Sequence, residues 1–219
     1  MATRHTKTWN FDEYDWVDQY DERMRRHGRL RYDEALARMA ELAQVQAGGI
    51  VLDIGTGTGN SAIPFLERGC RVVGLDPSER MLEQAREKAG RWRGQFTVQR
   101  VNGPFLAIPF GEEAFDVVAS AYTIHHLDDD AKRQAVREMK RVLRPAGRIV
   151  IADTMFRDAA NKAQALAVYP DLEDEYQPLL TTFPVMFEDA GFEVVMDQVG
   201  ELVWVVVAGP PASPGPAAC

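Results

Sequence analysis

The sequence has little cysteine, fewer basic than acidic residues and no long apolar run, and each of these features argues against a class of protein. Its only cysteines are Cys70 and Cys219, so neither a disulfide framework nor a cysteine-ligated metal site is indicated, and a cytoplasmic location is expected. The longest apolar run, near LVWVVVAG, is too short to cross a bilayer, and we find no signal-peptide core or membrane segment. The net charge of −8 argues against a polyanionic partner such as RNA or DNA.

Short apolar runs alternate with amphipathic segments through most of the 219 residues. Nearly continuous apolar strands that alternate with helices indicate a parallel sheet covered on both faces. The last two apolar runs have no helix between them and turn at Gly200, so we expect them to pair antiparallel. The expected strands are residues 49–54, 71–76, 95–101, 114–120, 147–153, 192–200 and 201–209. Residues 60–69 are expected to form a helix that ends at Gly69, and residues 78–90 a helix with Ser78 as its N-cap and Gly90 as its stop.

The remaining segments complete the predicted domain organisation. Residues 1–46 are expected to form a helical cap or lid, 47–208 an α/β core, and 209–219 a flexible tail rich in Pro, Gly and Ala. Residues 155–190 are expected to be a helical insertion near the substrate. We place the cap and the insertion at the carboxyl edge of the sheet, where open α/β folds bind ligands.

The segment VLDIGTGTGN, residues 51–60, ends a strand with an aspartate and then places three glycines within five residues. Glycine adopts positive φ freely and lets a ligand approach the backbone, and a following helix adds free N–H groups. A plain strand-to-helix turn is one interpretation, but it needs fewer glycines. A dinucleotide site is another, because residues 57–62 fit G-x-G-x-x-A. The Asp53 carboxylate would repel a pyrophosphate there and suit a positive amino group.

Asp76 ends the second expected strand, one strand–helix unit after the glycines. A carboxylate in this place can accept hydrogen bonds from both hydroxyls of a ribose. The alternative is a turn-starting aspartate before Pro77. We favour the ribose role because of its place at a strand end.

Taken together, these stretches resemble the class I S-adenosylmethionine-dependent methyltransferases. VLDIGTGTG and VVGLDPSERML resemble the first two motifs of that family, and FDVVASAYTIHHLDD and MKRVLRPAGRIVIAD resemble the later ones. WVDQYDERM resembles the N-terminal element that closes over the cofactor. The resemblance covers roughly residues 9–208 and is strongest to the small-molecule branch that includes the ubiquinone and menaquinone methyltransferases. It implies a Rossmann-like fold of seven strands with a C-terminal antiparallel hairpin.

The resemblance also implies which residues hold S-adenosylmethionine. Asp53 and the glycine turn would hold its methionine end, Asp76 its ribose, and Ala121 would lie beside the sulfonium. Pro77 and Met81 would flank the adenine. Tyr20 would contact the cofactor carboxylate or the acceptor. The full set is Tyr20, Asp53, Gly55, Thr56, Gly57, Gly59, Asp76, Pro77, Met81, Asn102, Gly103, Phe105 and Ala121.

The chain departs from the family pattern at two places. Pro104 stands where an acid usually accepts a hydrogen bond from the adenine amino group, so the Asn102 amide would have to substitute. One lost hydrogen bond of about 1 kcal/mol weakens binding several-fold and does not abolish it. Residues 144–147, RPAG in place of KPGG, suit a type I turn without functional consequence.

Methyl transfer requires positioning of the acceptor and, for an acceptor that loses a proton, a general base. His125 and His126 follow the fourth expected strand and are the candidates. The alternative is that one of them packs beneath the next helix. The acids at 128–130 are expected to cap that helix and not to bind a metal.

Two features of the N-terminal region remain. Five arginines between residues 23 and 31 indicate a solvated helix face or, alternatively, recognition of an anionic substrate. Five aromatic residues indicate a lid that excludes water during transfer: Trp9, Phe11, Tyr14, Trp16 and Tyr20.

The sequence therefore predicts a methyltransferase for a small molecule. An RNA or protein methyltransferase and a non-catalytic cofactor-binding module are the alternatives, and a homodimer is left open.

Overall fold

The computed structural model describes residues 11–92, 94–103, 105–173 and 175–211, which form one seven-stranded sheet with helices on both faces. Trp9, Pro104 and the 212–219 part of the expected tail lie outside the described residues. In the part of the chain that is described, no helix is both long and apolar enough to cross a membrane.

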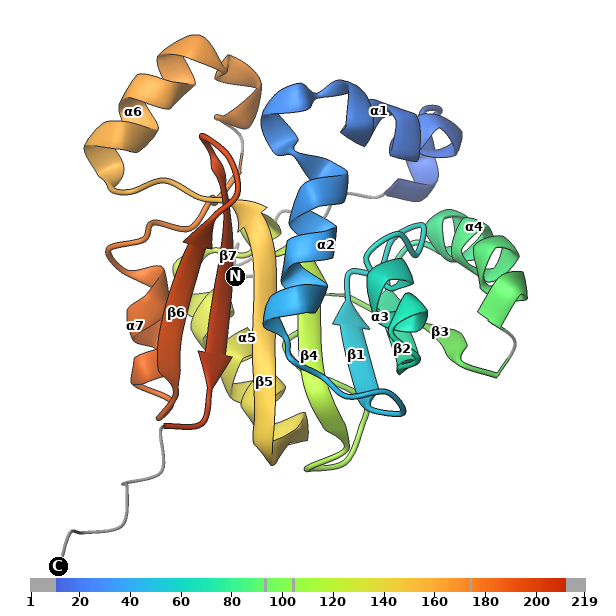
Figure 1. Cartoon of the computed structure of the whole chain (residues 1–219). Helices are drawn as coiled ribbons and strands as arrows, with labels where there is room; N and C mark the ends of the chain where they lie inside the picture. The colour runs from blue at the N-terminus through green and yellow to red at the C-terminus, as the bar shows by residue number, and fades with distance from the viewer. Residues whose placement is uncertain (1–10, 93, 104, 174, 212–219) are drawn as a thin grey trace, which may run out of the picture.

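The sheet has the order β3-β2-β1-β4-β5-β7-β6 (Figure 1). Strands β1 to β5 are mutually parallel, and β7 runs antiparallel to both of its neighbours. The predicted fold class is thereby confirmed, including the C-terminal hairpin. The strands are β1 (Ile50–Ile54), β2 (Arg71–Asp76), β3 (Phe96–Arg100), β4 (Phe115–Ala121), β5 (Leu143–Thr154), β6 (Glu193–Gln198) and β7 (Val203–Gly209).

Side chains alternate along the strands and fill two separate cores. Val51 points into the core that is shared with α2 (Tyr32–Leu42), α3 (Ile63–Glu67) and α4 (Glu79–Ala89). Its neighbour Leu52 points into the core on the other face, with α5 (Asp129–Val142) and α7 (Phe183–Glu188). This period-2 alternation is what a strand buried on both sides requires.

Two helices lie beyond the carboxyl ends of the parallel strands, α1 (Tyr20–Arg26) and α6 (Ala159–Val168) (Figure 1). The cap and the first part of the insertion therefore lie at the expected edge of the sheet. Short 3₁₀ turns join these elements: η1 (Phe11–Glu13), η2 (Val17–Gln19), η3 (Gly28–Leu30), η4 (Gly90–Trp92), η5 (Ile124–His126) and η6 (Pro170–Leu172).

The insertion is less helical than expected. It holds two separate helices, and only α6 lies over the edge, whereas α7 packs beside β6 in the core. Phe183 and Phe187 of α7 are fully buried there, which explains why this helix is drawn away from the edge.

Two local predictions were wrong. The helix expected from Asn60 begins only at Ile63, because the cap-forming side chains are engaged elsewhere: Asn60 accepts from Lys88, and Ser61 donates to Asp53. Residues 144–147 form no separate turn and lie within β5. There Leu143 pairs with Phe115 and Arg148 with Val117, so the intervening residues bulge out of the ladder.

Candidate functional site

The three glycines of the first turn all have positive φ, at +70° for Gly55, +52° for Gly57 and +85° for Gly59. A Cβ on Gly55 would lie 2.2 Å from the Thr123 Oγ1 atom, and one on Gly59 would lie 3.0 Å from the Phe96 ring. Among the described residues, a Cβ on Gly57 would meet only the Gly55 carbonyl oxygen, at 4.0 Å. Packing therefore requires glycine at 55 and 59, while the space beside Gly57 stays open.

Asp53 is fully buried at the carboxyl end of β1, directly before this turn. Its Oδ2 atom accepts hydrogen bonds from the Thr56 and Ser61 hydroxyls, both at 2.6 Å. Its Oδ1 atom is buried and has no hydrogen-bond partner among the described residues. Burial outweighs these hydrogen bonds and raises the pKa of Asp53 to about 6. An oxygen in this condition fits a cationic N–H donor.

Asp76 ends β2 and faces the same turn. Its two oxygens accept from the backbone N–H groups of Gly57 and Ser78, each at 2.9 Å. Burial outweighs these bonds and raises the pKa of Asp76 to about 6. Each carboxylate oxygen still has a second lone pair, so the group can accept two ligand hydroxyls. Ser78 caps α4 by accepting from the Met81 N–H, as expected.

A cavity of about 200 Å³ is lined by Leu75, the residue before Asp76 on β2, and by residues 99–102 at the end of β3. Asn102 lines it together with the apolar side chains of Leu75, Phe105 and Ile108. Asn102, the expected substitute for the adenine-binding acid, thus shares one cavity with Phe105, another member of the expected cofactor set. Met81 is buried at the start of α4, and Gly103 has a φ of +90° in the turn that follows β3.

The N-terminal residues 11–30 contact the turns around these aspartates. Asp12 accepts from the Ser78 hydroxyl, and Asp21 accepts from the Thr58 hydroxyl at 2.6 Å and from Lys88. The four expected aromatic residues within the described part of the chain gather here: Phe11 packs on Tyr14, Trp16 and Tyr20, and Trp16 stacks on both tyrosines. The segment therefore lies against the glycine turn and the start of α4.

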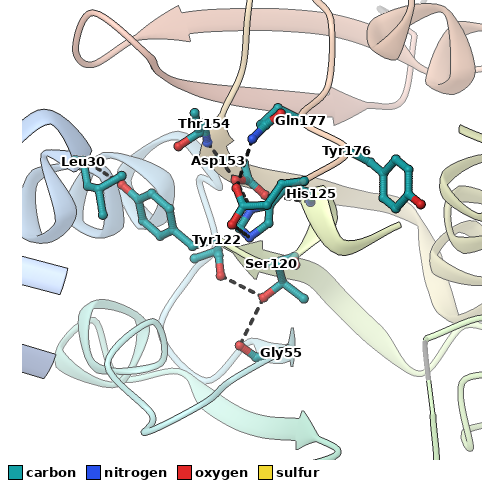
Figure 2. A network of polar contacts seen from close by, with 12 residues as sticks. Leu30, Gly55, Ser120, Tyr122, His125, Asp153, Thr154, Tyr176 and Gln177 are labelled. Atoms are coloured by element: carbon teal, nitrogen blue, oxygen red, sulfur yellow. Dashed lines mark hydrogen bonds and ion pairs between the residues drawn. The ribbon is translucent and has the colours of Figure 1, made fainter. Parts of the chain in front are cut away.

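The two histidines occupy η5, immediately beyond Ala121 at the end of β4. His125 is buried, and its Nδ1 atom lies 2.7 Å from an oxygen of the fully buried Asp153 (Figure 2). Its Nε2 atom faces a Glu175 oxygen at 3.8 Å. Burial alone would lower the pKa of His125, but Asp153 outweighs it and raises this pKa to about 8. His126 instead packs its ring against Phe11, with 6.1 Å between centroids.

Sequence reasoning missed Asp153 and Glu175. Asp153 could have been found, because it follows the apolar run of the fifth expected strand just as Asp76 follows the second. Glu175 lies in the insertion, where no periodic pattern indicates which side chain turns inward.

The remaining candidates have structural partners. Asp128 caps α5 by accepting from the Ala131 N–H at 2.9 Å, as expected. Among the described residues, no three His, Cys, Asp or Glu side chains are grouped as metal ligands. In the arginine run, Arg25 pairs with Asp33 and Arg29 with Asp171, which favours ion pairing within the protein over an anionic substrate.

Comparison with known proteins gives consistent matches. The model of a methyltransferase domain matches residues 51–147. An uncharacterised methyltransferase of Geobacillus kaustophilus is 37% identical over 201 residues, covering 88% of this chain and 89% of that protein. The YcgJ protein of Bacillus subtilis is 27% identical with a TM-score of 0.66, covering 76% of this chain and 71% of YcgJ. A SAM-dependent methyltransferase of Aquifex aeolicus has the same fold, with a TM-score of 0.63 at 23% identity and coverage of 90% and 98%.

Proposed function

Because this chain belongs to the methyltransferase family of these relatives, we propose that it transfers the methyl group of S-adenosylmethionine to a small-molecule acceptor. One observation carries the cofactor assignment: the buried Asp53 Oδ1 atom, which has no hydrogen-bond partner among the described residues. A buried carboxylate oxygen left in this state is costly, and an ammonium group relieves the cost. S-adenosylmethionine carries an ammonium and no phosphate, whereas a dinucleotide would bring a pyrophosphate toward Asp53.

The other predicted residues would each contact a different part of the cofactor. Asp76 would hold the ribose hydroxyls, the cavity with Asn102 and Phe105 would take the adenine, and Ala121 would lie beside the sulfonium. The space beside Gly57 would let the methionine end approach the backbone. The cofactor supplies a methyl group that is already activated, so the protein has mainly to position the acceptor.

The charge and the covering elements support a small acceptor. A net charge of −8 is unfavourable for RNA, and the arginines of the N-terminal run are largely paired with acids. Residues 11–30 contact the turns at the site, where a macromolecular substrate would need open surface. The closeness to the ubiquinone and menaquinone enzymes stays a prediction, as do the domain boundaries, the cytoplasmic location and the homodimer.

Isotope transfer tests this function against its alternatives. The protein is incubated with S-adenosylmethionine labelled in its methyl group and with a bacterial extract separated into metabolite, protein and RNA fractions. Label should enter the metabolite fraction, and Asp76→Asn should reduce it, whereas Asp197→Asn, the same change on β6 far along the sheet, should not. Label in protein or RNA would contradict the proposal. No label in any fraction would favour the non-catalytic module.

A further inference from the structure

The turn after β4 brings a histidine and a carboxylate together beside the glycine turn. Thr123, in this turn, packs so closely on Gly55 that no Cβ fits there, and His125 follows two residues later. Asp153 reaches His125 from the end of the neighbouring strand β5 (Figure 2). The pair therefore lies next to the segment that would hold the methionine end of the cofactor.

Asp153 is fixed by more than the imidazole. It accepts backbone N–H groups from Thr154 at 2.7 Å and from His125 at 3.3 Å. Since a carboxylate only accepts, the His125 Nδ1 atom carries the proton of the short contact. Nε2 is consequently the nitrogen that exchanges protons. It makes no hydrogen bond to any residue that the structure describes.

Four charged or titratable groups face His125 from the surrounding elements. Asp153 lies on β5 and Glu175 lies in the loop after η6, and both favour the protonated imidazole. Lys132 of α5 opposes it, and the His126 ring lies 4.2 Å away between centroids. Lys132 also donates to the Tyr176 carbonyl at 2.7 Å, which holds the loop with Glu175 opposite Nε2.

We infer that His125 is the catalytic base, that Asp153 is its positioning residue, and that the methyl acceptor is a protic group that loses its proton on transfer. This inference rests on the proposed function. Asp153 holds the imidazole in the tautomer that leaves Nε2 free to accept a proton, and it stabilises the imidazolium that results.

The step balances without a further reactant. The acceptor atom forms a bond to the methyl carbon while the carbon–sulfur bond of the cofactor breaks. The electron pair of that bond remains on the cofactor sulfur and neutralises its charge. The proton of the acceptor passes to Nε2 of His125 and then to solvent.

The acceptor class follows from the geometry of the pair, because an imidazole oriented by Asp153 serves an acceptor that has a proton to lose. A base works best when its pKa lies near that of the group it deprotonates and near the working pH. The pKa of His125, which Asp153 raises to about 8, agrees with this role, and a thiol with a pKa of about 8.5 and a phenol with a pKa of about 10 are suitable protic probes. A thioether or a tertiary amine has no proton to lose and would need no such pair.

His126 serves as the matched control. It is the neighbouring residue on η5, and its ring packs on Phe11 of the N-terminal segment, while the ring of His125 contacts Asp153. The same His→Gln change at the two positions therefore separates a chemical role from loss of an imidazole in this turn.

The test combines turnover, cofactor binding and titration in the full-length chain. Formation of S-adenosylhomocysteine is followed from about pH 6 to pH 10 with dithiothreitol and catechol as protic probes and dimethyl sulfide as the aprotic probe. The wild-type rate with a protic probe should rise about tenfold per pH unit and level off near pH 8. His125→Gln should lose about 100-fold or more, and His126→Gln should keep the break near pH 8 whatever its effect on the absolute rate. Asp153→Asn should move the break to lower pH, because the carboxylate that raises the pKa is gone.

The outcomes separate this inference from the proposed function. If the wild-type protein binds no S-adenosylmethionine in calorimetry, both the proposed function and this inference are contradicted. Normal binding together with an unchanged rate and pH profile in His125→Gln would overturn the inference alone. Preferential methylation of dimethyl sulfide, or no transfer to either protic probe despite bound cofactor, would overturn the acceptor class.

A titration without any acceptor checks the histidine itself. In imidazole NMR with S-adenosylhomocysteine bound, His125 should titrate near pH 8 in the wild type and at lower pH in Asp153→Asn. A His125 resonance with the same midpoint in both proteins would contradict the positioning role.

Discussion

At the residue scale, Asp53 and Asp76 differ in how their carboxylate oxygens are hydrogen-bonded. Asp76 is hydrogen-bonded by backbone N–H groups through both oxygens, while Asp53 has one oxygen satisfied by hydroxyls and one without a partner. Burial raises the pKa of both groups to about 6. The unliganded fold therefore carries an electrostatic cost at neutral pH, and a ligand with an ammonium and hydroxyls reduces it.

These raised pKa values predict opposite pH effects on stability and on binding. Both folded-state values, about 6, exceed the unfolded value of 3.8. Between these limits the folded state binds more protons, so the unliganded protein should gain stability as the pH falls from 7 to about 5. Affinity for S-adenosylmethionine should fall over the same range, because a protonated Asp53 attracts an ammonium less. Thermal unfolding with and without ligand measures both. Stability and affinity that fall together would contradict this assignment.

Substitution separates the ribose contact from the adenine contact. Asp76→Ala should weaken S-adenosylmethionine binding more than Asn102→Ala does. Two charge-assisted hydrogen bonds of roughly 1.5–3 kcal/mol each depend on Asp76, whereas Asn102 replaces one neutral bond of about 1 kcal/mol. Calorimetry on both variants makes the comparison, and affinities equal to wild type in both would show that the site lies elsewhere.

The glycine turn gives a second separation, between folding and binding. Gly55→Ala should destabilise the fold by roughly 2–4 kcal/mol, because its Cβ would strike Thr123 and its φ is positive. Gly57→Ala should cost only about 1–2 kcal/mol in stability but should weaken cofactor binding on the order of tenfold or more by filling the open space. Thermal unfolding and calorimetry measure the two effects, and a Gly57→Ala protein with wild-type affinity would argue that no ligand approaches there.

The positions of single site residues could be predicted from the sequence where the residue lies at the end of a strand. Apolar periodicity locates the ends of the strands, so Asp53 and Asp76 could be brought to one edge without coordinates. The contact between His125 and Asp153 spans 28 residues, and its distance depends on how two strand ends and a 3₁₀ turn are packed. The sequence around either residue does not specify this packing, so the contact could not be predicted.

At the scale of elements, the N-terminal segment and the insertion meet above the sheet. Arg29 pairs with Asp171 and stacks over the Tyr169 ring at 5.1 Å. Asp12 and Asp21 anchor the same segment to the turns below. The two elements that cover the carboxyl edge are therefore joined to each other and to the site.

This arrangement predicts that residues 1–28 act as a lid. Their deletion should speed cofactor release about tenfold or more and abolish turnover, since several buried or charge-assisted contacts are lost. The core should remain folded, because α2 lies beyond the deletion and buries Ala35, Leu36 and Met39 against the sheet. Stopped-flow release of a fluorescent cofactor analogue measures the first effect, and circular dichroism checks the fold. A folded deletion protein with unchanged release and activity would exclude a lid.

Elements with strong periodicity matched their expected positions, and the exceptions have local causes. Helix α4 runs from its Ser78 cap to Gly90 as the sequence indicated. Helix α3 is short because the Asn60 side chain accepts a hydrogen bond from Lys88 and the Ser61 hydroxyl donates one to Asp53, so neither caps the helix. Such competition between partners becomes visible only when distant elements are in place.

At the scale of the whole molecule, the sheet order reverses direction between β1 and β4. Open α/β sheets bind ligands at such a reversal, beyond the carboxyl ends of the strands. The glycine turn follows β1 and the histidine turn follows β4, so the two halves of the proposed chemistry flank this point. The α/β alternation was sufficient to predict the layers, whereas the separation of α6 from α7 depended on which face each could bury.

Calorimetric titration of the full-length protein with S-adenosylmethionine, S-adenosylhomocysteine and NAD tests the central claim most directly. Saturable binding of the first two at one site is expected, with no heat from NAD. Asp53→Asn should weaken binding of both, because the carboxylate facing the ammonium is lost, while Asp197→Asn on β6 should leave it unchanged. Heat from NAD together with none from either sulfur compound would contradict the claim.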